Sequence, residues 1–353
     1  MSRRGVTFAV AALSTVVLAV LAAVLPVPYV VLVPGPVTDT LGTVPGGTKP
    51  VVSVTHGQSY PTDGHLYLTT VGVVPGSCDA HPTLLQALRA WFDSTEAVQP
   101  HQVLCPPGES SAAVQRQNER DMARSQQDAV TAALLQLGYH PATRRILVGS
   151  VTDGSPAANV LRAGDAIFAV NGDAVTSATR LRALIGAHPV GTALTVTIRR
   201  GGHQRDVTIR TIAEPSTGRP IIGITPDLHA TFTKPRVTIG IDPAEVGGPS
   251  AGLAFSLGVV DKLTRGSLTG GRTVAGTGTI DGFGNVGPIG GIQQKIAAAV
   301  RAGATVFLAP AGDCADAVTA APSSLTLVKV DTLATALHAL AAIRAGSSDF
   351  PRC

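Results

Sequence analysis

The longest apolar stretch of the chain begins a few residues after its N-terminus. Residues 6–25 form a largely apolar run, and no Asp, Glu, Lys or Arg occurs from Gly5 to Thr38. At about 1.5 Å per helical residue, such a run is long enough to cross the hydrocarbon core of a bilayer. The pattern predicts a membrane-spanning helix.

The residues that flank this run indicate its orientation. Arg3 and Arg4 precede it, and positive side chains usually mark the cytoplasmic end of a span. The run is longer than the roughly 7–15 residues of a signal-peptide core, and no clear cleavage site precedes Pro26, although Ala22 and Ala23 leave cleavage as an alternative. We expect an uncleaved, single-pass anchor in the cell membrane, with the rest of the chain outside the cytoplasm.

Strand and helix patterns follow the anchor. Strand-like alternation occurs at residues 51–55 and 66–74. Helical periodicity predicts a short helix at 84–92 and a longer one at 118–137, which Gly138 ends. The two strands belong neither to the anchor nor to the β-rich unit that follows, so we expect them to pair with the C-terminal domain.

The rest of the chain divides at a polar linker over residues 214–220. Before the linker, strand patterns at 146–148, 195–198 and 206–209 surround a helix at 179–185. After it, strands and helices alternate, which is typical of packed α/β layers. We therefore predict an α+β protein with an N-terminal transmembrane helix (residues 1–33), an extracytoplasmic segment (34–126), a β-rich domain (127–213) and a C-terminal α/β domain (214–353).

Composition excludes two classes of partner. Charged residues are 14% of the chain, aromatic residues 4%, and the net charge is +4. Basic residues form no block longer than a pair, so we expect no nucleic-acid binding. The cysteines show no Cys-x-x-Cys spacing and no accompanying histidine cluster, so we expect neither a metal site nor another cofactor.

The four cysteines suit an oxidising compartment. Outside the cytoplasm, disulfides form and persist. The simplest of the three pairings joins Cys78 to Cys105 and Cys314 to Cys353, with free thiols as the alternative.

Two glycine-rich segments in the last third of the chain carry the candidate chemistry. Ser250 lies in Gly-Gly-Pro-Ser-Ala-Gly, and Lys295 follows Gly-Gly-Ile-Gln-Gln. A serine becomes a nucleophile when a base takes its proton, and a neutral lysine can be that base. If a helix begins near Ile292, its dipole and apolar neighbours lower the pKa of Lys295 toward the ~7–8 that a base needs. Read separately, the serine is a helix cap and the lysine a solvated side chain.

Together with Gly-Thr-Gly-Thr-Ile at residues 276–280, these segments resemble the proteolytic domain of the Lon protease family over about residues 225–345. The resemblance implies that Ser250 is the nucleophile, Lys295 the general base, and Thr277 the residue that orients the amine. The backbone N–H groups of Ser250 and Gly248 would then stabilise the oxyanion.

One position departs from the family pattern. Many members carry Asp three residues before the serine, and this chain has Gly247 there. Asp242 or Glu245 offers a weakly supported substitute.

The β-rich block resembles the PDZ domains of bacterial proteases, through Gly-Asp-Ala-Ile at 164–167 and Val-Asn-Gly at 170–172. Such domains bind a peptide end as an added strand. The loop that receives the peptide carboxylate maps onto Leu137, Gly138 and Tyr139, for which a helix stop is the alternative.

The order of these units favours a particular kind of peptidase. The 353 residues contain no Gly-x-x-x-x-Gly-Lys-[Ser/Thr] motif, which an ATPase module would carry. The chain thus resembles the membrane-anchored, ATP-independent PDZ–Lon peptidases of bacteria.

Three functions follow from this resemblance. We expect a serine endopeptidase acting on proteins or peptides, attached to the membrane and capable of forming homo-oligomers, as Lon domains often do. The alternatives are a PDZ receptor or chaperone with a non-catalytic Lon-like scaffold, and a hydrolase of non-peptide amides.

Overall fold

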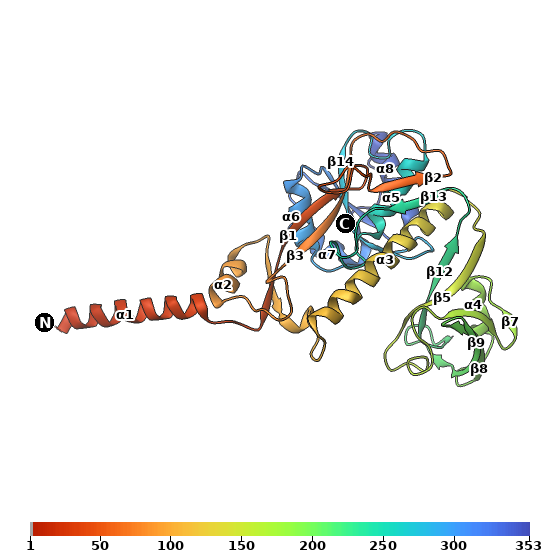
Figure 1. The fold of residues 1–353 in the computed structure, drawn as a ribbon, viewed down its shortest axis with the longest axis horizontal. Coiled ribbons are helices and arrows are strands. Elements are labelled where there is room, and N and C mark those ends of the chain that lie inside the picture. Colours follow the sequence, from red (N-terminus) through yellow and green to blue (C-terminus); the bar gives the residue numbers. More distant parts are fainter. Residues whose placement is uncertain (1–2) are drawn as a thin grey trace.

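The computed structural model describes residues 3–353, and its N-terminal helix stands apart from the rest (Figure 1). Helix α1, Arg3–Val24, extends from one end of the molecule and makes no buried contacts over its apolar part. Within the described residues it is the one helix long and apolar enough to cross a membrane.

The larger folded unit is built on a six-stranded mixed sheet with the order β18-β17-β14-β3-β1-β4. Strand β14 is parallel to both β3 and β17, whereas β1 is antiparallel to β3 and β4. Half of this sheet therefore comes from the first hundred residues and half from the last hundred. The strands are β1 (Tyr29–Asp39), β3 (His65–Val74), β4 (Ala97–Pro100), β14 (Thr273–Gly276), β17 (Val306–Pro310) and β18 (Thr326–Val330).

A second, two-stranded pairing also joins distant parts of the chain. Strand β2, Val52–Thr55, is antiparallel to β13, Arg236–Ile239. The two segments with strand-like alternation near residues 51–55 and 66–74 thus both pair with strands of the C-terminal domain. The C-terminal domain is consequently one structural unit with residues 29–100.

Helices cover both faces of the six-stranded sheet because its central strands alternate two sets of apolar side chains. Leu66, Leu68 and Val274 face one core, while Ala275 and Phe307 face another. The first core is closed by α3 (Ser111–Gln136), α5 (Gly252–Leu263) and α8 (Leu333–Arg344), and the second by α6 (Ile292–Arg301) and α7 (Cys314–Ala320).

The β-rich domain lies at the end of the molecule opposite α1 (Figure 1). Its sheet has the order β12-β5-β6-β8-β9, and helix α4 packs over the same core. Its elements are β5 (Thr143–Val151), β6 (Ala166–Val170), β7 (Asp173–Ala174), α4 (Ala178–Gly186), β8 (Ala193–Arg200), β9 (His203–Arg210) and β12 (Ile224–Thr231).

The bounds of this domain differ from the expected 127–213. Residues 127–136 belong to α3, whose Ala129, Ala132 and Ala133 are buried in the core of the C-terminal domain. At the other end, the polar segment 214–220 joins the short paired strands β10, Ile212–Ala213, and β11, Pro220–Ile221. Only then does β12 complete the sheet, so the domain runs from about 143 to 231.

The β-rich domain is inserted into the larger unit through two neighbouring connections. Thr143 and Thr231 are paired across β5 and β12, and their hydroxyl oxygens lie 2.6 Å apart. The chain thus leaves α3, forms the domain and returns to β13 at almost the same point.

Two disulfides fix loops of the larger unit. Cys78 is bonded to Cys105, and Cys314 at the start of α7 is bonded to Cys353. No free cysteine is present in the described chain.

Candidate active site

Ser250 lies in a tight turn just before α5. Its carbonyl oxygen accepts hydrogen bonds from the Gly278 N–H at 2.9 Å and the Thr277 hydroxyl at 3.1 Å. The turn needs Gly252, because a Cβ there would lie 2.6 Å from a methyl group of Ile280. The turn is thereby held against the segment that follows β14.

Lys295 reaches the same point from the first turn of α6. The helix begins at Ile292, after Gly291 with φ +69°, and the Lys295 N–H donates to the Gly291 carbonyl at 3.1 Å. The side chain is only 3% exposed. Its Nζ lies 2.8 Å from Ser250 Oγ and 3.0 Å from Thr277 Oγ1, so the structure brings all three side chains together.

Burial lowers the pKa of Lys295 to about 8, and the negative charge of Asp313 partly opposes this shift. The neutral amine is therefore accessible near physiological pH. The hydroxyl proton of Thr277 is donated to the Ser250 carbonyl, so Thr277 can only accept a hydrogen bond from Nζ. That bond leaves the single lone pair of the neutral amine free to face Ser250 Oγ.

A cavity of about 360 Å³ opens beside Ser250. Pro249 and Ser250 line one side, Thr279 another, and residues 288–290 form the remaining wall. Asp313 Oδ2 accepts the Ile289 N–H at 3.0 Å and so holds that wall in place. The cavity gives a peptide carbonyl access to the serine hydroxyl.

The backbone groups around Ser250 correct one expectation. The Gly248 N–H donates to the Asn118 carbonyl at 3.0 Å, so it is not available to an oxyanion in this conformation. The N–H groups of Ser250 and Ala251 have no acceptor within residues 3–353. Sequence reasoning missed Ala251, although the residue after the nucleophile is a known source of an oxyanion donor.

The structure also accounts for Gly247. A Cβ at this position would lie 2.8 Å from Cβ of Asn118 on α3, so a larger residue would force the two segments apart. Neither acidic neighbour replaces the missing carboxylate: Asp242 accepts the Ala244 N–H at 2.9 Å, and Glu245 is exposed.

The expected carboxylate-binding loop of the β-rich domain is a helix stop instead. Gly138 has φ +80°, and the N–H groups of Leu137, Gly138 and Tyr139 donate to carbonyls in the last turn of α3 at 2.9–3.0 Å. Leu137 and Tyr139 also pack against the core of the larger unit. No N–H in this segment is left for a peptide carboxylate.

The sheet of this domain ends at strand β12, and α4 contacts this edge strand. The turn that leads into β12 is Ile-Ile-Gly-Ile at 221–224, with Gly223 at φ +81°. This short glycine-containing run follows the linker, and the sequence analysis did not consider it as the start of an edge strand.

Helix α3 connects the β-rich domain to the turn that holds Ser250. Arg124 forms an ion pair with Asp227 on β12 and donates to the Gly149 carbonyl at 3.1 Å. One residue later, Ser125 Oγ donates to the Pro249 carbonyl at 2.9 Å. The same helix thus contacts both the PDZ-like sheet and the peptide unit that precedes Ser250.

A hairpin next to Thr277 makes the second connection. Strands β15, Thr279–Ile280, and β16, Val286–Gly287, are joined by a turn whose Gly282 N–H donates to Asp227 Oδ1 at 3.2 Å. Phe283 of this turn packs against the core of the β-rich domain. The contact leaves no room for a side chain at Gly282, because its Cβ would overlap the Leu228 carbonyl.

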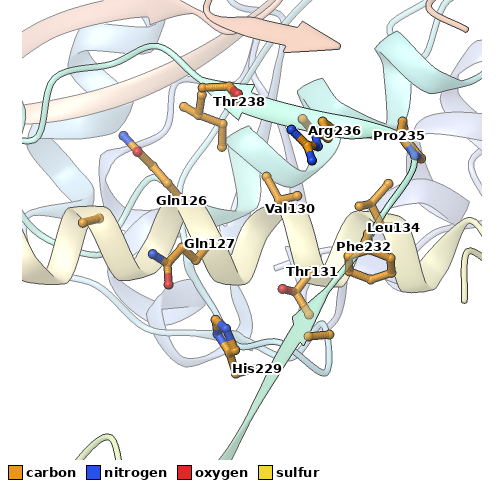
Figure 2. A pocket seen from close by; sticks show the side chains of 14 residues that line it. Gln126, Gln127, Val130, Thr131, Leu134, His229, Phe232, Pro235, Arg236 and Thr238 are labelled. Atoms are coloured by element: carbon orange, nitrogen blue, oxygen red, sulfur yellow. The ribbon is translucent and has the colours of Figure 1, made fainter. Parts of the chain in front are cut away.

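A larger cavity, of about 460 Å³, lies on another side of α3. Gln126, Val130, His229, Phe232 and Thr238 are among the residues that line it (Figure 2). Its lining includes neither Ser250 nor Lys295, so the smaller cavity is the candidate active site.

Comparison with known proteins finds two kinds of domain in the chain. Residues 117–211 match the PDZ domain model, and residues 227–342 match the model of the Lon protease (S16) C-terminal proteolytic domain. Lon protease 1 of Bacillus subtilis is 39% identical over 90 residues, which are 25% of this chain and 11% of that protein. Lon protease 2 of Herpetosiphon aurantiacus is 48% identical over 63 residues, 18% of this chain and 8% of that protein.

A solved PDZ domain is also similar to part of this chain. The PDZ domain of the SdrC-like protein of Listeria monocytogenes is 34% identical, covering 23% of this chain and 85% of that one, with a TM-score of 0.22.

The two family models show that this chain combines a PDZ domain with a proteolytic domain. The proteolytic domain is of the Lon type, and the combination is consistent with an ATPase-lacking PDZ–Lon peptidase. The chain spans only about a tenth of the length of the curated relatives named here.

Proposed function

We propose that this protein is a membrane-anchored, ATP-independent serine endopeptidase with a Ser250–Lys295 dyad. The observation that carries the proposal is the 2.8 Å separation between Lys295 Nζ and Ser250 Oγ, at a lysine that is 3% exposed. A scaffold without activity would require neither a buried lysine nor a serine hydroxyl at the wall of a cavity.

The proposed reaction has two halves. Neutral Lys295 takes the Ser250 proton while Oγ attacks the scissile carbonyl, and the resulting ammonium returns the proton to the leaving amine. Water then attacks the acyl ester with Lys295 again as base, which releases the carboxylate and restores the serine hydroxyl. The N–H groups of Ser250 and Ala251 are the proposed oxyanion donors.

We assign substrate or regulatory peptide binding to the PDZ domain. An extended peptide would add to β12 near its start, at residues 224–226 beside α4, because the hairpin at Gly282 already contacts the strand at Asp227 and Leu228. The 353 residues hold no phosphate-binding loop of the P-loop type, so the proposed cleavage of unfolded or extended segments proceeds without ATP.

The test is cleavage of an unstructured protein by the purified full chain in vesicles, without nucleotide. Wild type should cleave, whereas Ser250→Ala and Lys295→Arg should not, because arginine keeps the charge but does not release its proton at working pH. Thr277→Ala should slow cleavage by roughly 10–100-fold, because it removes orientation and leaves the base in place.

Two outcomes would reject the proposal. Binding of the substrate without cleavage by any of the four proteins would favour a PDZ receptor or chaperone. Near-normal cleavage by Lys295→Arg would mean that Lys295 is not the base.

A further inference from the structure

Helix α2, Leu84–Phe92, has its large apolar side chains on the outside. Leu85, Leu88, Trp91 and Phe92 are 54%, 45%, 73% and 86% exposed, whereas the inward-facing residues are the small Ala87 and Ala90. A helix on the surface of a water-soluble domain normally has the opposite arrangement. These four residues, called the α2 patch below, form an apolar surface that needs a partner.

The position of α2 identifies that partner. The Leu84 N–H donates to the Leu25 carbonyl at 2.9 Å, and the Val27 N–H donates to the Pro82 carbonyl at 3.0 Å. The helix therefore begins directly against the residues that follow α1, as Figure 1 also shows. If α1 crosses a bilayer of ~30 Å hydrocarbon thickness, its last residues reach the headgroup region, and α2 lies at that level.

The attachment of α2 is rigid. Thr83 and Gln86 form a capping box that fixes the start of the helix. The Cys78–Cys105 disulfide closes the loop that contains α2, and β4 in the same loop pairs with β1, the first strand after the anchor. The α2 patch cannot turn inward without breaking these contacts.

We propose that the α2 patch inserts into the lipid headgroup–acyl boundary and is a second membrane contact of this protein. Tryptophan and phenylalanine beside leucine are the side chains that favour this depth of a bilayer. The contact would hold the catalytic domain at a fixed distance from the membrane, where α1 alone would leave it free to tilt. This inference is independent of the Ser250–Lys295 dyad.

Trp91 is the only tryptophan of the chain, so its fluorescence reports on the patch alone. The full chain is reconstituted into vesicles of phosphatidylcholine and phosphatidylglycerol, with and without bromine atoms on the acyl chains. Bromine quenches tryptophan on contact. We expect Trp91 emission at a shorter wavelength than for exposed tryptophan, and weaker emission in the brominated vesicles.

Two variants serve as controls. Trp91→Phe/Val190→Trp moves the tryptophan to an exposed loop of the PDZ domain, where bromine should have no effect. Leu85→Ser/Leu88→Ser/Phe92→Ser keeps Trp91 and α1 but removes the rest of the patch, and bromine quenching should be lost. Circular dichroism and cleavage of an unstructured protein check that each variant is folded.

Three results would overturn the inference. The first is that brominated lipid does not quench Trp91 of the wild type. The second is that quenching persists in the triple serine variant, which would mean that the tether alone brings Trp91 to the bilayer. The third is that Trp91 is shielded from acrylamide but insensitive to bromine, which would indicate a second copy of the chain on the patch.

Discussion

Lys295 combines deep burial with the absence of a carboxylate in contact. No ion pair to it occurs within residues 3–353, and Asp313 acts on it only through its field. Desolvation therefore dominates, and it disfavours the charged form. A lysine in this environment is suited to accept a proton and unsuited to hold one.

The rate of cleavage should depend on pH through this residue. Only the neutral amine accepts the serine proton, so kcat/KM should rise with pH and level off above the Lys295 pKa of about 8. The measurement is a pH–rate profile for a short unstructured peptide. Lys295→Ala should lower the plateau by ~10²–10⁴-fold and remove this inflection. An unchanged inflection in that variant would assign it to another group.

The burial that makes Lys295 a base should also lower the stability of the folded protein while the lysine is charged. Below pH 8 the folded protein must keep an ammonium in an apolar site, and the cost disappears as pH rises from about 8 to the ordinary 10.5. Lys295→Met removes the charge and keeps the stem. At pH 7 we expect this variant to be more stable by at most about 3 kcal/mol, less the contribution of the two lost hydrogen bonds. Urea unfolding at several pH values measures the difference, which should shrink above pH 8.

The sequence was sufficient to indicate Ser250, Lys295 and Thr277 because each lies in a short segment with its own local signature. It was insufficient for Gly248, whose N–H meets the Asn118 carbonyl of a helix far away in the chain. Whether a backbone donor is free depends on tertiary contacts, and no local pattern reports them.

At the scale of elements, α3 is the structural link between the two domains. Its Asp128 lies 3.6 Å from the Arg124 guanidinium, yet burial and the nearby Asp227 raise the pKa of Asp128 to about 8. The protonated form of Asp128 is therefore favoured far above the pH at which an exposed carboxyl ionises. Arg124 contacts both this acid and Asp227 on β12.

Replacement of that acid should change the pH dependence of stability. Because the folded-state pKa of Asp128 lies far above the ordinary 3.8, wild type loses stability as pH rises between about 4 and 8. Asp128→Asn has a similar shape and does not titrate, so its advantage should grow across this range and stay constant above it. Thermal unfolding at matched pH values tests this. A constant difference between the two proteins would contradict it.

The elements were largely predictable, as was the pairing of residues 51–55 and 66–74 with the C-terminal domain, but the assignment of α3 was not. The periodicity of residues 118–137 indicated a helix, and the structure extends it to Ser111–Gln136. The pattern could not show that its alanine face packs on α5 instead of on the PDZ sheet that follows it. The segment 137–139, in which a carboxylate-binding loop was expected, is the end of this helix.

At the scale of the whole molecule, the catalytic unit is interrupted by the PDZ domain. Both β2 and β3 pair with strands that come after that domain. A fragment of residues 215–353 should therefore be unstable and prone to aggregate, because β14 and β13 would have unpaired edges.

A matched variant keeps those strands. Replacement of residues 142–231 by a short Gly/Ser linker removes the PDZ domain at the point where its two connections meet. This variant should fold and retain Ser250-dependent cleavage, although with reduced stability because α3 loses its contacts with the PDZ sheet. Circular dichroism and size-exclusion chromatography compare the two proteins. Stable folding of 215–353 alone would refute the role given to β2 and β3.

The interrupted sheet also sets the order of events during synthesis. Strand β3 emerges early, but its parallel neighbour β14 is made about 200 residues later. At a synthesis rate of ~5–20 residues per second, β3 remains without this neighbour for roughly 10–40 s. Ser250 precedes β14 in the chain, Thr277 directly follows it and Lys295 comes later still, so all three side chains are made only late in synthesis. Ser250 and Lys295 thus come together only when synthesis is nearly complete, and a product that ends before Lys295 never brings them together.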